Sequence, residues 1–148
     1  MRSIGIGVLL LALALGQGGC LWYQGQFDPL HKGDAFDDAQ RRFTRLLRWH
    51  QLEKASEMVD PQQRQAFLDE ARHLRALRFT DYEILVKDPG PELETGTVDV
   101  VFYAYTLSTM IERTILVRQD WYLDGDNGRW WVRPEIDTQT RALSQSAP

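Results

Sequence analysis

The sequence predicts an α+β domain in which N-terminal helices pack on a strongly curved antiparallel sheet. Two patterns carry this expectation: apolar side chains recur every three or four residues over 35–74, and β-branched and aromatic residues dominate 78–134. The 148 residues suit one domain, and a content of 43% hydrophobic and 26% charged residues excludes a disordered chain or a polytopic membrane protein. The net charge of −4 gives no basis for a nucleic-acid partner.

The helical half contains two start signals. Asp34 is a suitable N-cap, and the apolar pattern runs from Ala35 to about Leu52 and can continue, kinked, over 55–59. The second start is Asp60, because a proline at the first helical position and a glutamine at the third follow it. The buried stripes of the two helices are Phe36, Phe43, Leu47 and His50, then Phe67, Ala71 and Leu74.

After residue 74 the helical period gives way to alternation, and four strands are predicted. They cover 78–87, 97–107, 111–123 and 129–134. The first strand places Tyr82, Ile84 and Val86 on one side. The segments 88–91 (DPGP) and 124–128 (DGDNG) are turns, since proline cannot continue a strand and Asn-Gly supplies the positive φ of a tight hairpin. Such long strands predict a curved sheet whose concave face wraps the helices.

The first twenty residues have the layout of a secretory signal. Arg2 precedes an apolar run over 4–15, which is shorter than the roughly 20 residues that a membrane-spanning helix needs. The only cysteine of the chain, Cys20, follows two glycines. The segment resembles a bacterial lipoprotein signal, although Gln17 stands where that family usually has an apolar residue. The resemblance implies removal of 1–19, acylation of Cys20 and attachment to a lipid bilayer.

Two other interpretations of this segment stay open: an ordinary signal-peptidase site at 12–14 (ALA), with Cys20 left as a free thiol, or an uncleaved anchor. Under the lipoprotein interpretation, Leu21 directly after the acylated cysteine resembles the sorting signal of outer-membrane lipoproteins. We therefore expect the chain in the cell envelope, anchored to the outer membrane and facing the periplasm. Residues 20–33 form an irregular tether, and 137–148 form a polar tail.

Between the tether and the tail, the chain resembles the NTF2-like superfamily of cone-shaped α+β domains. The resemblance rests on the helical half followed by RFTDYEIL, VDVVFYAYTL, RTILVRQDWYLD and DGDNGRWWV, and it makes 34–136 one domain. More narrowly, the chain is similar to small bacterial lipoproteins of that fold. The superfamily includes isomerases, dehydratases, transport factors and many binding modules, so the resemblance implies a fold but decides no chemistry.

Enzymes of this superfamily line the cone with an acid and a tyrosine donor. Alternation puts Asp99, Tyr103 and Tyr105 on one strand face. Another strand face carries Arg118, Asp120 and Tyr122. Such groups also occur on a solvated sheet surface with cross-strand ion pairs, so we assign no catalytic residue and lean against enzymatic activity. Tyr103 and Tyr105 are candidates for a pocket or a partner contact.

No metal ion or cofactor is expected. The three histidines, His31, His50 and His73, have neither HxxxH nor HExxH spacing. The acidic segment 124–128 invites a calcium interpretation, but an EF-hand loop would need an oxygen ligand at Gly128 and a glycine at Arg129. A hairpin turn is therefore the better interpretation.

The last strand places two tryptophans on opposite faces of the sheet. Trp130 is expected to pack on the helices, whereas Trp131 either contacts an envelope protein partner or is covered by the tail or the lead-in. We expect a non-catalytic binding or assembly module on the periplasmic face of the outer membrane, its oligomeric state open. The alternative is a small-molecule-binding protein, or an isomerase- or dehydratase-like enzyme, that uses the cone pocket.

Overall fold

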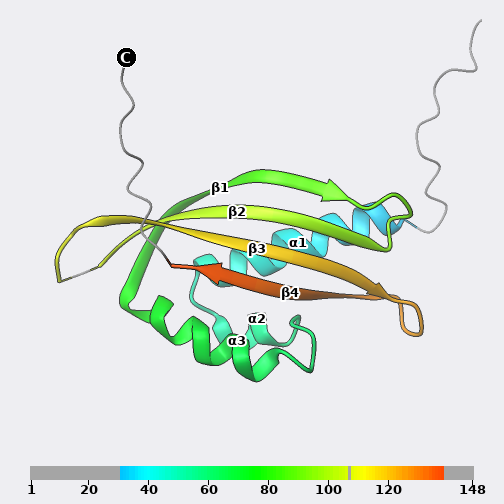
Figure 1. Ribbon diagram of the computed structural model, residues 1–148, viewed down its shortest axis with the longest axis horizontal. Coiled ribbons are helices and arrows are strands. Elements are labelled where there is room, and N and C mark those ends of the chain that lie inside the picture. The colour runs from blue at the N-terminus through cyan, green and yellow to red at the C-terminus, as the bar shows by residue number, and fades with distance from the viewer. Residues whose placement is uncertain (1–30, 107, 139–148) are drawn as a thin grey trace, which may run out of the picture.

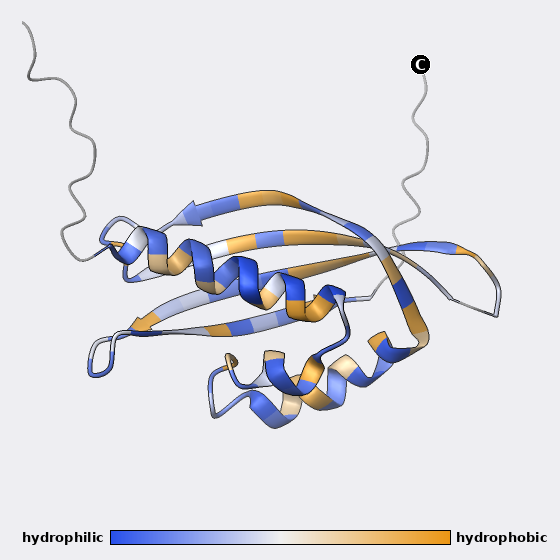
Figure 2. Cartoon of the chain, turned by 180° about the vertical axis from the view of Figure 1, so that it is seen from behind, coloured by the Kyte–Doolittle hydropathy of each residue, from blue (hydrophilic) through white to orange (hydrophobic). Residues whose placement is uncertain are grey.

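The structure confirms the α+β class, with N-terminal helices packed on one antiparallel sheet (Figures 1 and 2). It is a computed structural model that describes residues 31–106 and 108–138. The elements are α1 (Lys32–Arg48), α2 (Leu52–Ser56), α3 (Arg64–Ala71), the 3-10 helix η1 (Arg72–Ala76), β1 (Leu77–Pro89), β2 (Thr95–Thr106), β3 (Glu112–Asp124) and β4 (Arg129–Asp137). The predicted signal segment 1–19, Cys20, the tether up to residue 30 and the tail from residue 139 lie outside the described residues.

The first helix differs from the expectation at both ends. α1 begins at Lys32 rather than after an Asp34 cap, and Asp34 lies inside its first turn, where a carboxylate complements the positive end of the helix dipole. α1 ends at Arg48, and His50 follows with a left-handed φ of 53°. That residue turns the chain into the separate helix α2, so the single helix predicted as far as Leu52 is wrong.

The second predicted helix start is displaced for a tertiary reason. Asp60 does accept a hydrogen bond from the Gln62 backbone (3.0 Å), but residues 61–63 form a turn and α3 begins at Arg64. The Asp60 carboxylate has a second partner, the Arg133 guanidinium of β4, at 2.8 Å. The residue therefore fastens the loop before α3 to the sheet instead of capping the helix.

The sheet is an open antiparallel meander in the order β1-β2-β3-β4, with β1 and β4 as its edges. The strong curvature expected from the strand lengths is absent: the sheet is neither closed nor strongly curled, and its long strands run alongside α1 (Figure 1). The predicted turn at 124–128 is confirmed, with Gly128 at a φ of 67° and its N–H bonded to the Asp124 carbonyl. Among the described helices, none has the length and apolar composition needed to cross a bilayer.

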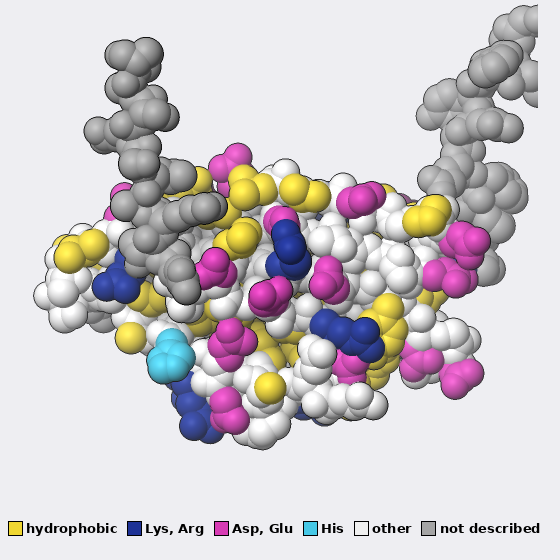
Figure 3. All heavy atoms as spheres, in the orientation of Figure 1, with side chains coloured by type: hydrophobic (Ala, Val, Ile, Leu, Met, Phe, Trp, Pro, Cys, Tyr) yellow, Lys and Arg dark blue, Asp and Glu magenta, His cyan; other side chains and the backbone are white. Residues whose placement is uncertain are grey.

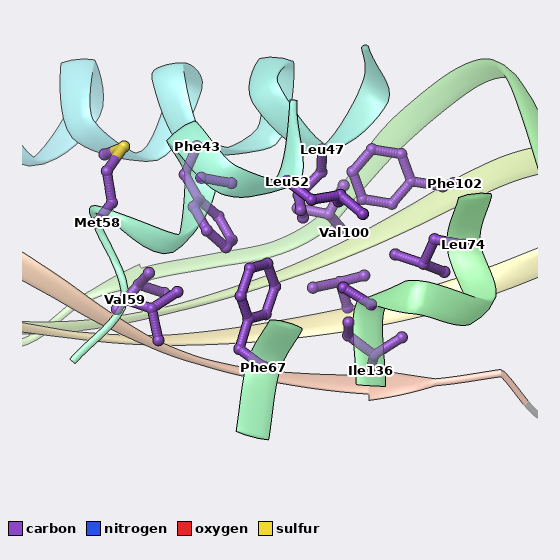
Figure 4. Close-up of a cluster of buried hydrophobic side chains, with 14 of the residues drawn as sticks. Phe43, Leu47, Leu52, Met58, Val59, Phe67, Leu74, Val100, Phe102 and Ile136 are labelled. Carbon is purple, nitrogen blue, oxygen red and sulfur yellow. The ribbon is translucent and has the colours of Figure 1, made fainter. Parts of the chain in front are cut away.

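The core lies between the helices and the face of the sheet that they cover, which we call the inner face (Figure 4). Phe43 of α1 and Phe67 of α3 meet there with ring centroids 6.1 Å apart. Trp130 is only 5% exposed and its ring centroid lies 5.0 Å from that of Phe36, as the alternation predicted. The sheet contributes Val98, Val100, Phe102, Ala104, Ile115, Val117, Trp121, Val132 and Ile136.

The predicted apolar side of β1 is only partly buried. Tyr82 packs against the core, but Ile84 and Val86 are exposed. The pairing of β1 with β2 shifts register twice, between Phe79 and Asp81 and between Ile84 and Val86. Each shift inserts an extra residue and interrupts the alternation on which the expectation rested.

Candidate functional site

The helices and the inner face of the sheet bury a cluster of apolar side chains between them. Polar residues among them bond to one another: Gln40 and Gln119 each donate from Nε2 to the Thr44 hydroxyl, at 3.0 and 3.1 Å. Trp121 donates from Nε1 to the Gln119 carbonyl oxygen at 3.3 Å. All four residues are buried. This network joins α1 to β3, and it leaves one of its own atoms, the Gln40 carbonyl oxygen, buried without a hydrogen-bond partner among the described residues.

The opposite face of the sheet, which we call the outer face, holds both groups of residues considered for catalysis. Asp99 and Arg118 are register partners, and the guanidinium donates two hydrogen bonds to the carboxylate, at 2.9 and 3.1 Å. The two strand faces therefore belong to one surface of the sheet. Asp120 belongs to it and accepts from the Thr97 hydroxyl at 3.1 Å. The arrangement is that of cross-strand pairs on a sheet surface.

Tyr103 and Tyr105 also lie on this outer face and not toward the core. Both are half-buried, and the Tyr103 hydroxyl donates to Glu83 of β1 at 3.2 Å. This hydrogen bond and the charge of Glu83 raise the pKa of the Tyr103 hydroxyl. A tyrosine that serves as a hydrogen-bond donor in catalysis would point into an enclosed site, and neither of these does.

The most elaborate part of the outer face surrounds Trp131, the third candidate contact residue. Trp131 is half-buried, and the Arg129 guanidinium lies over its ring, with Cζ 4.1 Å from the centroid. Tyr122 is its register partner on β3. Arg133 lies over the Tyr122 ring in turn, with Cζ 4.5 Å from the centroid. Two aromatic rings, each covered by a guanidinium, therefore lie side by side, which is the composition typical of protein contact sites.

Asp60 completes this group, and sequence reasoning missed its role. It is only 5% exposed, although it comes from the loop before α3. Two backbone hydrogen bonds join that loop to the edge of β4: the Asp60 N–H donates to the Val132 carbonyl, and the Val132 N–H donates to the Met58 carbonyl. Burial alone would raise the pKa of Asp60, but hydrogen bonds from Arg133 and the Gln62 backbone outweigh it and lower that pKa. In the sequence, Asp60 is recognisable only as a possible helix N-cap, and this pattern does not indicate its contact with Arg133.

The chemistry of this group favours binding over catalysis. A general base needs a pKa close to the working pH, whereas the lowered pKa keeps Asp60 ionised and bound to Arg133. Burial and the neighbouring Asp60 raise the pKa of Tyr122, which keeps its hydroxyl protonated. Within residues 31–106 and 108–138, no set of three or more His, Cys, Asp or Glu side chains is arranged to hold a metal ion.

Comparison with known proteins identifies the fold but no family. No family model matches the chain, and no curated protein matches its sequence. The fold is similar to that of a SEC-C motif containing protein from Rhodopseudomonas palustris, with a TM-score of 0.53 and 16% identity over 68% of this chain and 75% of that one. A second similar structure is the intermembrane space region of the chloroplast protein ARC6, with a TM-score of 0.45 and 10% identity over 71% of this chain and 95% of that region.

Proposed function

We propose that this chain is an envelope lipoprotein, acylated at Cys20, whose NTF2-like α+β domain is a non-catalytic binding or assembly module at the periplasmic face of the outer membrane. One observation carries the choice of a binding module: the inner face is packed with buried side chains, while the aromatic and charged residues gather around Trp131 on the outer face. A ligand-binding cone would need the opposite arrangement, with polar groups converging inside. We therefore favour a protein partner over a small molecule.

Two further features support the proposal. The helices lie on one face of an antiparallel meander, which is compatible with an NTF2-like domain. The solitary Cys20 after an apolar run of 12 residues supports the lipid anchor, because the run is too short to span a bilayer.

The anchor is tested by lipid labelling and fractionation of the full chain. Cys20→Ser is expected to abolish incorporation of labelled fatty acid and either to release the protein from membranes or to leave its precursor uncleaved. A Ser variant that is processed and membrane-bound like the natural chain would contradict the lipoprotein proposal.

The binding surface is tested by affinity capture of the lipidated chain from native membranes. Trp131→Ala is expected to lose the captured partner, since the indole and its Arg129 cover form the centre of the proposed contact. Trp49→Ala is the matched control, because Trp49 is an exposed tryptophan that follows α1, on the side of the sheet away from Trp131. Equal capture by the natural chain and both variants would remove the outer face around Trp131 as the binding surface.

A further inference from the structure

The outer face of the sheet carries more carboxylates than cations in its middle rows. Strand register places six acidic residues there: Glu83, Asp88, Asp99, Asp120, Glu135 and Asp137. We call these six residues the acidic surface. The cations of the same rows are Arg118 and Arg133. Figure 3, which views the molecule from the side of the sheet opposite α1, shows acidic side chains between hydrophobic ones over the strands.

Both of these arginines are already bound to a carboxylate. Arg118 pairs with Asp99, and Arg133 pairs with an aspartate of the loop before α3. Asp120 and Glu135 are exposed and form no ion pair within the described part of the chain. Hydrogen bonding to Asp99 raises the pKa of Arg118, and the charges of Asp120 and Glu135 raise it further. One guanidinium therefore lies among three carboxylates, which leaves this part of the face negative.

The excess of negative charge also acts on a carboxylate of the helical layer. Burial raises the pKa of Glu70 on α3, and the charge of Glu135 raises it further, against an opposite effect of His73. Glu135 is thus repelled by a like charge from the neighbouring element. A cation that contacted Glu135 from outside would reduce this repulsion as well as gain an attraction of its own.

Apolar side chains lie among these charges. Val86 is the register partner of Asp99 and is 46% exposed, and Leu85, the residue inserted beside it at the register shift, is 55% exposed. In the next row, Val101 and Leu116 are register partners and are half-buried. Apolar area surrounded by charges of one sign is suited to a protein partner of the opposite sign.

The sign of the charge excludes several other occupants of this face. Nucleic acids and anionic lipid surfaces would be repelled by it. Two copies of the chain that met through this face would place identical carboxylates opposite each other, because a twofold contact pairs the same patch with itself. Within residues 31–106 and 108–138, no acidic group is arranged to hold a metal ion. The complement that remains is a cationic segment of another protein.

We propose that the partner of the outer face carries a lysine- or arginine-rich segment that lies on the acidic surface. This inference rests on the proposed function, because it names the chemistry of the partner assigned to the face around Trp131. The two regions are continuous: Asp120 is the register partner of Arg133, and the next row of the same face holds Tyr122 and Trp131. The carboxylates steer the cationic segment to the face, and the apolar and aromatic side chains supply the contact area.

The experiment uses the full acylated chain in an uncharged detergent at low salt. The probe is a fluorescein-labelled peptide in which lysine alternates with serine, and its binding is measured by fluorescence anisotropy. The chain is expected to bind this peptide, to release it as salt is added, and to ignore the matching peptide in which glutamate replaces lysine. Amide NMR shifts on addition of the lysine peptide should fall on the outer-face residues of β2 and β3.

Two double variants with the same change of net charge locate the binding. Asp120→Asn/Glu135→Gln is expected to weaken binding of the lysine peptide on the order of tenfold, because it removes two exposed carboxylates of the acidic surface. Asp34→Asn/Asp38→Asn is the matched control, since it removes two exposed carboxylates from α1, on the other side of the sheet. It should bind the peptide nearly as tightly as the natural chain.

The inference is overturned if the lysine peptide does not bind, or if both double variants lose the same amount of binding. It also fails if self-association of the natural chain in sedimentation is lost in Asp120→Asn/Glu135→Gln, which would identify a second copy as the occupant. Affinity capture from native membranes separates it from the proposed function. A partner lost with Trp131→Ala but fully retained by Asp120→Asn/Glu135→Gln would keep the binding module and contradict only its cationic partner. Capture that is unchanged by Trp131→Ala would contradict the proposed function itself and the inference with it.

Discussion

The ring of Phe36 lies directly on the backbone of Gly96. A Cβ atom at position 96 would be 2.7 Å from the Phe36 Cζ and 2.8 Å from Cε2, closer than a carbon side chain can approach. Glycine at this point of β2 lets α1 lie close to the sheet, and the same ring also contacts Trp121 and Trp130. One backbone position therefore decides how closely the N-terminal end of α1 packs on three strands.

Gly96→Ala is expected to destabilise the protein by about 1–3 kcal/mol, because a buried aromatic ring must shift to admit the methyl group. The measurement is the free energy of unfolding from denaturant titration. Phe36→Leu provides the test of mechanism: the smaller side chain should reduce the additional cost of the alanine in the double variant. Additive costs of the two changes would show that the ring is not what Gly96 accommodates.

The two tryptophans of β4 should differ sharply in their contribution to stability. Trp130→Ala removes a buried ring packed on Phe36 and is expected to cost about 3–5 kcal/mol. Trp131→Ala should cost less, since that ring is half-buried on the outer face beneath Arg129. Thermal and denaturant unfolding of the two single variants compare them. Equal losses, or a larger loss at Trp131, would contradict the assignment of the two sheet faces.

Residues whose placement depends on local periodicity were predictable from the sequence. The spacing of Phe36, Phe43 and Leu47 fixes the buried side of α1, and alternation alone distinguishes Trp130 from Trp131. The candidate contact residues were identified in this way, but not their partners. Alternation predicts which residues of one strand share a face. It does not predict which residues of the next strand lie opposite them.

Features that depend on pairing between distant segments could not be predicted. Asp99 faces Arg118 only because of the register that the β2–β3 hairpin adopts. A shift of that register by one residue would move the side chains of one strand to the other face of the sheet. The bulges of β1, which expose Ile84, leave no pattern in its own sequence. Asp60 has the local signature of a cap, and only the distant Arg133 explains its burial.

The ion pair between Arg133 and Asp60 should give a pH-dependent contribution to stability. Arg133→Ala leaves a buried carboxylate without its charged donor, which is expected to cost about 1–3 kcal/mol near neutral pH, moderated by the partial exposure of the arginine. In the natural protein the pKa of Asp60 is lowered, so the stabilisation is present above its ordinary value of 3.8 and is lost as the pH falls through the lowered pKa. The cost of the substitution should therefore shrink in acid.

Arg129→Ala is the matched control for that experiment. Arg129 comes from the same strand, but it donates to the Glu57 backbone carbonyl, which does not titrate. Its cost should therefore be much the same at neutral and acidic pH. Denaturant titrations of the two arginine variants near neutral pH and near pH 3 would contradict the proposed role of Asp60 if both costs changed in parallel.

His50 should make the protein less stable in mild acid. Its ring stacks on Phe79 with centroids 4.9 Å apart, and both ring nitrogens are buried. Burial and the charge of Arg78 lower the pKa of His50 below 6.5 and outweigh the opposite effect of the Leu77 backbone. The unfolded chain therefore binds the proton more readily than the folded one, so the full stability is present above about pH 6.5 and declines as the pH falls below it.

His50→Phe keeps a stacked ring but cannot be protonated, and its free energy of unfolding should decline less than that of the natural protein from about pH 7 to about pH 5. An NMR titration of the imidazole gives the independent check: a pKa at or above 6.5, or parallel declines of the two proteins, would show that His50 does not couple folding to pH.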